Sequence, residues 1–423
     1  MPGIIRKSSR RMRSRPPSSP SPNAPSPRGH HIMKVWHFSE LAYHPAWDEL
    51  GSSLRNVIPS RVMDPKIAAD LYHRYLDEWA LCDDLGLNIM MNEHHATVTC
   101  IDSVVTVPMS IMARETKKAR LLCLGMPLAN RQDAVRIAEE YAMIDVISRG
   151  RLEMGFVKGA PFEVYPANSN PADLMDRFWE SHDLIIKAMT SHDGPFNFEG
   201  KYYQYRQVNV WPRPYQTPHP PVWITVGSPD SCAAVADKGY VIATLNTGFT
   251  RTRGLYDAYR NRAAALGKPA PNDRFAYLAL IGVGNTKEEG YRIAHQIGDY
   301  SRTTPRTASQ FWTPPGYNPL ATAAQGIKAG PAAGAGSIFT ILGRNGRRID
   351  AMTASVDDFI DAGLMFAGTP DMVYDQIKDF YDTVGGFGHL LMMGQGGHIS
   401  HEDTVANLKL FSKEVLPRVQ ELT

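Results

Sequence analysis

Cysteine is scarce in this sequence and never closely paired. The chain of 423 residues has four cysteines, at positions 82, 100, 123 and 232, and no Cys-x-x-Cys occurs. A chain of this size without paired cysteines is typical of a reduced compartment and has no disulfide framework. We therefore expect a cytoplasmic protein whose fold is stabilised by packing and not by cross-links.

Long apolar runs and a strong net charge are also missing. No stretch of about 18 apolar residues occurs, so we expect no transmembrane helix and no membrane partner. The net charge of +2 argues against a surface built for nucleic acid. The positive charge is concentrated, because residues 1–32 hold seven Lys or Arg and no Asp or Glu. The rest of the chain is mildly acidic.

Residues 1–32 form a basic leader rich in Arg, Ser and Pro, which cannot build a packed core. The leader lacks the apolar region of a secretory signal. Its composition resembles that of a transit peptide, but a wrongly assigned start codon explains it better, because Met33 opens the first predicted strand. We therefore predict a disordered leader followed by a single folded domain over 33–423.

Several catalytic motifs are absent. The sequence has no Walker loop, no Gly-x-Gly-x-x-Gly between a strand and a helix, and no Gly-x-Ser-x-Gly elbow. His94 and His95 are adjacent, so their side chains point in different directions, and no second Cys/His cluster lies nearby in the sequence. We predict no metal site. A metal-dependent barrel hydrolase is the alternative that zinc at these two histidines would support.

Short apolar runs alternate with amphipathic stretches along the whole domain. The predicted strands are 33–39, 87–93, 119–128, 151–157, 220–227, 240–245, 274–284 and 388–394. The helices predicted after them are 64–86, 103–116, 131–148, 171–191, 228–238, 250–266, 286–302 and 401–422. Such alternation indicates a parallel sheet, and eight units in one domain favour a closed (β/α)8 TIM barrel over an open sheet.

Two segments interrupt the alternation. Residues 193–210 combine Gly turns with alternating aromatics, a pattern that predicts a hairpin appended to the barrel rim. Residues 303–354 contain TPPGYNP, KAGPAAGAGS and GRNGRR. A long irregular loop in a compact domain is usually a lid or a disordered excursion. Because it follows the seventh unit, we predict a mobile lid insertion over the barrel mouth.

Polar residues directly after the predicted strands are the candidate site, because barrel enzymes act at the carboxyl ends of their strands. After the second strand, His94 either packs at the rim or faces the mouth as a proton donor or acceptor. After the fifth strand, Gly227, Ser228 and Ser231 open a helix. Hydroxyls and free N–H groups there suit a phosphate, although a plain Ser cap is the commoner use. Lys158, after the fourth strand, is either solvated or paired with an anion.

Five fragments in the same order resemble the luciferase-like flavin monooxygenase family. They are EHH (93–95), RIAEEYAMIDVISRGRLEMGFVKG (136–159), PHPPVWITVGSPDSCAAVADKGY (218–240), AGTPDMVYDQIKDF (367–380) and LKLFSKEVLPRV (408–419). The resemblance implies a (β/α)8 barrel, usually a homodimer joined by helices of the first half. It also implies reduced FMN delivered by a separate flavin reductase, although some members use a reduced deazaflavin.

The resemblance implies roles for individual residues. His94 is similar in position to the family's catalytic histidine, which acts in proton transfer. Gly227, Ser228 and Ser231 resemble the family's flavin phosphate site. Lys158 stands where luciferase has an Arg on that phosphate, and it keeps the charge but loses the forked hydrogen bond.

The end of the third predicted strand also carries an implied role. Gly125 and Met126 resemble the place where the family has a non-prolyl cis peptide beneath the flavin ring. A Gly there eases close approach of the backbone, and Met126 is expected to touch the ring.

These features predict a two-component flavin-dependent monooxygenase. Such an enzyme uses reduced FMN and dioxygen to insert one oxygen atom into an apolar or carbonyl-containing small molecule. The alternatives are a deazaflavin-dependent hydride-transfer oxidoreductase of the same fold and a non-catalytic flavin-binding protein. The chain departs from luciferase at 40–63, 193–210 and 303–354, so the aldehyde substrate of luciferase is not transferred.

Overall fold

The computed structural model describes residues 32–50, 53–303, 306–312, 314–318, 320 and 340–423. The basic leader lies outside these residues except for Ile32, and so does much of the predicted lid. The described parts of the lid are α8 (Ser309–Trp312), β10 (Thr340–Leu342) and β11 (Arg348–Asp350), and the two strands form an antiparallel pair. A covering role for this segment stays a prediction.

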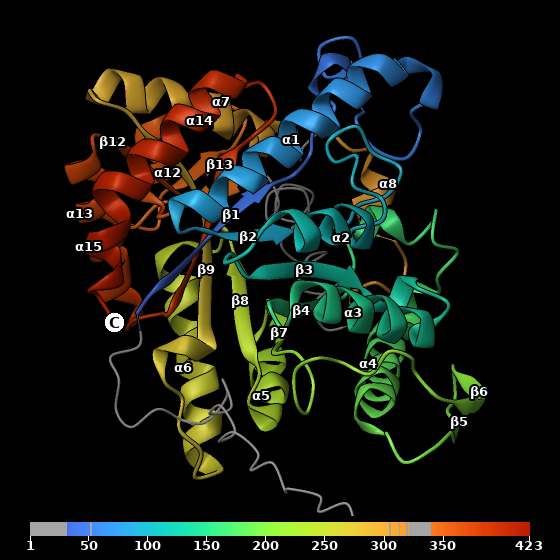
Figure 1. Ribbon diagram of the computed structural model, residues 1–423. Coiled ribbons are helices and arrows are strands. Elements are labelled where there is room, and N and C mark those ends of the chain that lie inside the picture. Colours follow the sequence, from blue (N-terminus) through green and yellow to red (C-terminus); the bar gives the residue numbers. More distant parts are fainter. Residues whose placement is uncertain (1–31, 51–52, 304–305, 313, 319, 321–339) are drawn as a thin grey trace, which may run out of the picture.

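In the described part of the chain, eight parallel strands close into a barrel (Figure 1). They are β1 (Lys34–Ser39), β2 (Asn88–Met91), β3 (Leu121–Pro127), β4 (Leu152–Val157), β7 (Val222–Thr225), β8 (Val241–Leu245), β9 (Phe275–Val283) and β13 (His389–Gln395). Neighbours follow chain order, and the pairs β8–β9, β9–β13 and β13–β1 complete the circle. The predicted barrel is confirmed, and each predicted strand coincides with one of these.

Helices follow the barrel strands and pack around them (Figure 1). They are α1 (Pro65–Leu85), α2 (Thr106–Glu115), α3 (Ala134–Ser148), α4 (Leu174–Thr190), α5 (Pro229–Lys238), α6 (Gly248–Ala265), α7 (Lys287–Thr303) and α14 (His401–Leu410), which continues through a π turn into α15 (Leu416–Gln420). Local chemistry sets their ends. Asp64 caps α1 by accepting from the amide of Lys66, and Gly86 ends it in the left-handed conformation at φ 72°.

A further strand and two helices separate the lid from the last barrel strand. They are α12 (Val356–Asp361), β12 (Met365–Gly368) and α13 (Pro370–Val384). The strand β12 pairs with the second half of β9, from Leu280 to Val283, beyond the pairing of β9 with β8. The sequence prediction of eight units missed this addition, because four fully buried residues are too few to show a period.

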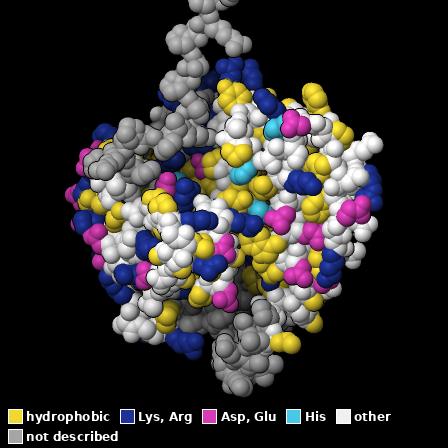
Figure 2. Space-filling view, turned by 90° about the horizontal axis from the view of Figure 1, so that it is seen from below, with side chains coloured by type: hydrophobic (Ala, Val, Ile, Leu, Met, Phe, Trp, Pro, Cys, Tyr) yellow, Lys and Arg dark blue, Asp and Glu magenta, His cyan; other side chains and the backbone are white. Residues whose placement is uncertain are grey.

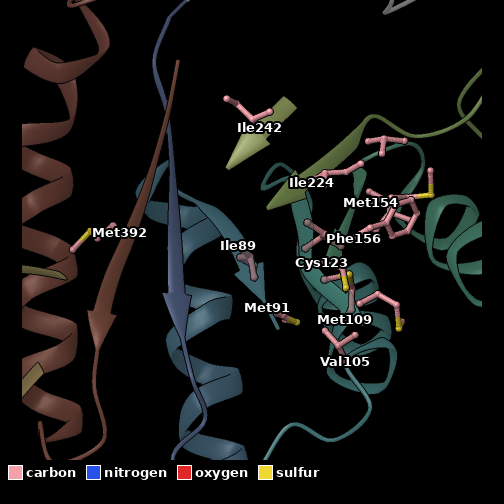
Figure 3. Packing of buried hydrophobic residues seen from close by; sticks show 14 of the residues in the cluster. Ile89, Met91, Val105, Met109, Cys123, Met154, Phe156, Ile224, Ile242 and Met392 are labelled. Atoms are coloured by element: carbon pink, nitrogen blue, oxygen red, sulfur yellow. The ribbon is translucent and has the colours of Figure 1, made fainter. Parts of the chain in front are cut away.

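Barrel side chains alternate between an inner and an outer core. In β3, Cys123 packs with the outer cluster, whereas Leu122 and Leu124 belong to the inner one. Figure 3 shows part of the outer layer, where Cys123 and Ile224 lie on the strands and Met109 on α2. The period of two along each strand produces this division, as a closed barrel requires.

A polar and aromatic cluster fills the amino end of the barrel. Trp36 Nε1 donates to His389 Nδ1 at 3.2 Å, and Trp223 Nε1 donates to Glu153 Oε2 at 2.5 Å. The carboxylate of Glu153 also pairs with Arg120. Because side chains occupy this end, a ligand is expected at the opposite, carboxyl end.

The predicted hairpin at 193–210 is present as β5 (Phe196–Glu199) and β6 (Gln204–Val208). Its tyrosines are engaged with neighbouring helices. The hydroxyl of Tyr203 donates to the carbonyl of Arg131 at 3.0 Å, and that of Tyr205 donates to Asp133 at 2.9 Å. The hairpin therefore packs outside the barrel, against the start of α3.

The surface charge is mixed on the face drawn in Figure 2, where basic and acidic side chains are interspersed. This mixing agrees with the net charge of +2. Among the helices of the described residues, none is long and apolar enough to cross a bilayer.

Candidate active site at the carboxyl end of the barrel

His94 lies just beyond β2 and contacts two buried carboxylates. Its Nδ1 is 2.9 Å from Oε1 of Glu163, and its Nε2 is 3.8 Å from Oε2 of Glu40. Glu163 is 1% exposed and Glu40 is 7% exposed, whereas the imidazole side chain is 24% exposed. A ligand at the mouth can therefore reach the histidine, while the two carboxylates stay shielded.

The two carboxylates set the charge of His94. Burial disfavours the imidazolium, but Glu163 and then Glu40 outweigh that effect and raise the pKa of His94 to about 9. At neutral pH the ring is therefore protonated on both nitrogens. Because Glu163 accepts from Nδ1, the proton on Nε2, 3.8 Å from the Glu40 carboxylate, is the one left for a ligand, and His94 can act as a proton donor.

Glu163 is itself held by backbone amides. It ends the 3-10 turn Pro161–Glu163, where its Oε2 accepts from the amide of Ala160 at 2.7 Å. Its Oε1 also accepts from the amide of His95 at 3.2 Å. These bonds fix the carboxylate before any ligand arrives, so the orientation of His94 is built into the fold.

Sequence reasoning missed both carboxylates. Glu40 directly follows the first strand, where site residues are expected. An isolated acidic residue matches no sequence motif, so nothing in the sequence singled it out. Glu163 lies in a loop beyond the fourth strand. Only closure of the barrel brings these two loops to His94.

An aromatic and cationic wall adjoins His94. The ring centroid of Phe162 is 5.7 Å from that of His94, and the guanidinium of Arg55 lies 4.9 Å from the Phe162 centroid and 5.7 Å from that of Trp312. Arg55 is only 4% exposed and donates to the carbonyl of Thr303 at 3.2 Å. The loop after β1 and the segment after α7 thus meet beside the histidine.

His95 serves a different carboxylate. Its Nε2 is 3.1 Å from Oε1 of Glu93, which is also paired with Arg131 at 2.5 Å. The two adjacent imidazoles therefore bind separate partners. Among the residues that the structure describes, no cluster of three or more His, Cys, Asp or Glu could hold a metal ion.

Gly125 and Met126 occupy different environments. The cis peptide of this region joins Leu124 to Gly125. A β-carbon on Gly125 would lie 2.4 Å from Cγ1 of Val157, so only glycine fits between β3 and β4 without a shift. Met126 is fully buried in the outer core. Contact of Gly125 and Met126 with a ring stays a prediction.

The predicted phosphate residues lie exposed at the start of α5. Ser228 Oγ accepts from the amide of Ser231 at 3.2 Å, and Ser231 Oγ accepts from the amide of Ser228 at 3.1 Å. Arg251, at the start of α6, donates to the carbonyl of Gly227 at 2.9 Å. The hydroxyl of Ser231 donates to the carbonyl of Ser228 at 2.7 Å, and that of Ser228 donates to Ser231 Oγ at 3.2 Å, so both hydroxyls are engaged within the cap, beside the guanidinium of Arg251. Asp230, in the same turn, is the acidic side chain that opposes an anion there.

Lys158 is engaged with the described part of the 303–354 segment. Its Nζ donates to the carbonyl of Tyr317 at 2.5 Å and lies 3.6 Å from the centroid of that ring. Tyr317 in turn donates to the carbonyl of Gly159 at 2.7 Å. Burial lowers the pKa of Lys158 to about 8. In this arrangement Lys158 binds Tyr317, so it reaches a phosphate only if that contact opens.

The histidine and the candidate phosphate residues share one end of the barrel. From β2 the order of neighbours is β3, β4 and β7, so Gly125 lies between His94 and Gly227. Three strand spacings of about 4.8 Å each put the two ends within roughly 15 Å of one another along the wall. This order suits a ligand with a planar ring at one end and a phosphate at the other.

Comparison with known proteins gives a consistent picture. A family model described as "Luciferase-like monooxygenase" matches residues 52–386. The oxygenase component of a flavin-dependent trigonelline monooxygenase from Acinetobacter baylyi is 28% identical over 180 residues, 42% of this chain and half the length of that protein. An F420-dependent glucose-6-phosphate dehydrogenase from Amycolatopsis mediterranei is 24% identical over 321 residues, 74% of this chain and 83% of the dehydrogenase.

The fold also matches solved structures. The oxygenating constituent of 3,6-diketocamphane monooxygenase from Pseudomonas putida, a type II Baeyer-Villiger monooxygenase in complex with FMN, superposes with a TM-score of 0.65. The match covers 92% of this chain and 98% of that chain at 19% identity. At this identity the likeness concerns the fold.

Proposed function

The chain belongs to the luciferase-like monooxygenase family, and from this premise we propose that it is the oxygenase of a two-component flavin-dependent monooxygenase. Reduced FMN, when bound, supplies the two electrons that activate dioxygen. One oxygen atom is inserted into an apolar or carbonyl-containing small molecule, and the other leaves as water. A separate flavin reductase provides the reduced FMN, which agrees with the "oxygenase component" in the name of the Acinetobacter relative.

The geometry of His94 carries the proposal. Its Nδ1 is held by Glu163 at 2.9 Å, so the protonated Nε2 keeps one orientation at the mouth. We assign to this Nε2 the proton that the departing oxygen needs. Glu163 is a positioning residue, because it acts on the reaction only through the imidazole.

The residues at the mouth fit a flavin mononucleotide. The first turn of α5 and the guanidinium of Arg251 supply donors for the phosphate, and the hydroxyls of Ser228 and Ser231 join them once they turn away from their bonds within the cap. The cis peptide between Leu124 and Gly125, at the end of β3, is where we place the planar ring, as the family resemblance implies. Lys158 joins the phosphate site only after release of Tyr317.

The wall beside His94 keeps water from the reacting atoms. Phe162, Trp312 and the buried stem of Arg55 present apolar surface on that side. Excluding water strengthens the charge interactions of His94 and limits wasteful release of reduced oxygen.

We further propose a homodimer through α2 and α3. Several apolar side chains of these helices are exposed, among them Val107 at 59%, Met143 at 50% and Ile147 at 43%. Apolar residues grouped on neighbouring helices are typical of a surface that is covered by a partner.

A second candidate is hydride transfer with a reduced deazaflavin. The Amycolatopsis dehydrogenase, named as F420-dependent, aligns over 74% of this chain and favours it. A flavin-binding protein without turnover is the third reading, and a histidine held in its proton-donating form argues against it.

Cofactor binding separates these candidates. The protein is titrated without oxygen with reduced FMN and, in parallel, with reduced F420, and oxygen uptake is then followed with a panel of ketones, aldehydes and terpenes. We expect micromolar binding of reduced FMN and substrate-dependent oxygen uptake. Binding of reduced F420 alone would establish the second candidate, and tight FMN binding without turnover across the panel would establish the third.

A further inference from the structure

A cavity of about 430 Å³ opens at the same end of the barrel as His94. It lies between the end of β8, the start of α6, the β10–β11 hairpin and α12. Arg251, on its wall, donates to the carbonyl of Gly227 at 2.9 Å, so the cavity adjoins the candidate phosphate residues. Its volume suits one small organic molecule.

Much of the cavity wall is apolar. The apolar side chains come from α6, β9, β10, α12 and the loop before β12, and they are Phe249, Leu280, Ile341, Phe359 and Leu364. Such a wall favours the body of an apolar ligand, because burying that body removes its surface from water.

The charge of the cavity has one sign. Its lining includes Arg251, Arg344 and Arg348 and no Asp or Glu. Arg344 is neutralised, because its guanidinium binds both oxygens of Asp379 at 2.7 and 3.1 Å. No carboxylate of the described residues pairs with Arg251 or Arg348. Two guanidinium groups therefore face the cavity without an acidic partner. An anion that enters the cavity would form ion pairs with them.

One residue of the cavity wall, Tyr300, lies near Glu40, a carboxylate that neighbours His94. Burial, followed by the charge of Glu40, raises the pKa of the Tyr300 hydroxyl. The carboxylate of Glu40 is 3.8 Å from Nε2 of His94. A molecule anchored at Arg348 can thus extend along the apolar wall toward Tyr300, on the side of the cavity nearer to Glu40.

We propose that this cavity binds the organic substrate and that the substrate carries a carboxylate, held by Arg348. Planar guanidinium groups bind carboxylates through paired hydrogen bonds, which orient as well as attract. The apolar body lies on the wall formed by β9, β10 and α12, with the carbon to be oxygenated toward Tyr300. This inference rests on the proposed function, because it names the substrate class of that same site.

A matched pair of probes tests the carboxylate. Naphthalene-2-carboxylate and its methyl ester are titrated calorimetrically into the wild-type protein, R348Q and R347Q. Arg347 is the matched control, since it neighbours Arg348, pairs with Asp358 and is not part of the cavity wall. We expect the acid to bind wild type at least about tenfold more tightly than the ester, with R348Q removing that preference and R347Q keeping it. Equal binding of acid and ester, or equal effects of the two variants, overturns the proposal.

Flavin binding, measured in the same samples, separates this proposal from the one on which it rests. If reduced FMN or inorganic phosphate displaces naphthalene-2-carboxylate, the arginines hold the flavin phosphate and the substrate proposal is overturned while the oxygenase proposal stands. If wild type binds the acid through Arg348 but binds no reduced FMN, the oxygenase proposal fails and the carboxylate site is supported.

Discussion

The amino and carboxyl ends of the barrel each place a histidine near a buried glutamate, and the two histidines differ in their charge. At the amino end, His389 accepts a hydrogen bond from Trp36 through Nδ1 at 3.2 Å and donates from Nε2 to the carbonyl of Asp273 at 3.1 Å. Both contacts suit a neutral ring. Burial, together with Lys34, lowers the pKa of His389 to about 4.

At the carboxyl end the partners of the histidine are carboxylates. Glu163 and Glu40 overcome burial and raise the pKa of His94 to about 9. The ring also keeps an exposed edge of 24%. Burial alone therefore does not make a reactive group. An ionised partner on one side and access on the other make His94 a proton donor, whereas His389 is part of the packing.

The largest loss of stability is expected when the hydrogen bonds of Glu153 at the amino end of the barrel are removed. In Glu153→Ala the buried N–H of Trp223 and the guanidinium of Arg120 lose their acceptor. We expect a loss of about 3 kcal/mol in the free energy of unfolding, measured by urea denaturation. The control Glu199→Ala breaks an exposed pair with Arg206 and should stay within about 0.5 kcal/mol of wild type. An unchanged free energy of unfolding in Glu153→Ala would show that the polar cluster at the amino end does not stabilise the fold.

Removing the histidine of the other end should lower activity far more than it lowers the affinity for reduced FMN. We expect His94→Ala to lower the rate of substrate oxygenation about 100-fold, because the proton donor is lost. The affinity for reduced FMN, measured by anaerobic titration, should change less than about threefold. His192 provides the control. Its side chain is exposed and lies after α4, at the opposite end of that helix from the barrel mouth, so His192→Ala should keep the wild-type rate.

The ion pair between His94 and Glu163 predicts how stability and activity depend on pH. Because the pKa of His94 is raised to about 9, the protonated ring stabilises the fold fully below its ordinary pKa, and this contribution is lost as the pH rises through about 9. Activity that needs the proton falls over the same range. Glu163→Gln should move the alkaline limit of the rate downward by about one pH unit or more. A pH–rate profile identical to wild type would exclude Glu163 as the positioning residue.

The smallest effect on the site is expected from the outer surface of the barrel. Val107→Asp places a charge on the apolar face of α2 and α3, which should shift a homodimer toward monomer in analytical ultracentrifugation. Ile67→Asp is the matched control on α1, where the side chain is 41% exposed. A protein that is monomeric before substitution, or a dimer untouched by Val107→Asp, contradicts the proposed interface. The pKa of His94 should be the same in both variants.

Local patterns carried much of the fold prediction. The apolar runs located all eight barrel strands, and Asp64 and Gly86 marked the ends of α1. The sequence did not predict strand β12, because its four residues are all buried and show no alternation of apolar and polar side chains. At the end of the third strand, Gly125 packs closely against Val157 of β4, and the contacts of Gly125 and Met126 with a flavin ring stay predictions.

By itself, the sequence determined the alternation of strands and helices, the order of the strand ends and the place of His94 after the second strand. These follow from local propensities and periods that each segment carries alone. Only the tertiary structure decided the charge of His94, because Glu163 and Glu40 come from loops after other strands and meet it through barrel closure. It also decided that Lys158 binds Tyr317 and that Arg251 stands beside the phosphate candidates, since contacts across 159 and 24 residues of chain depend on how the whole barrel packs.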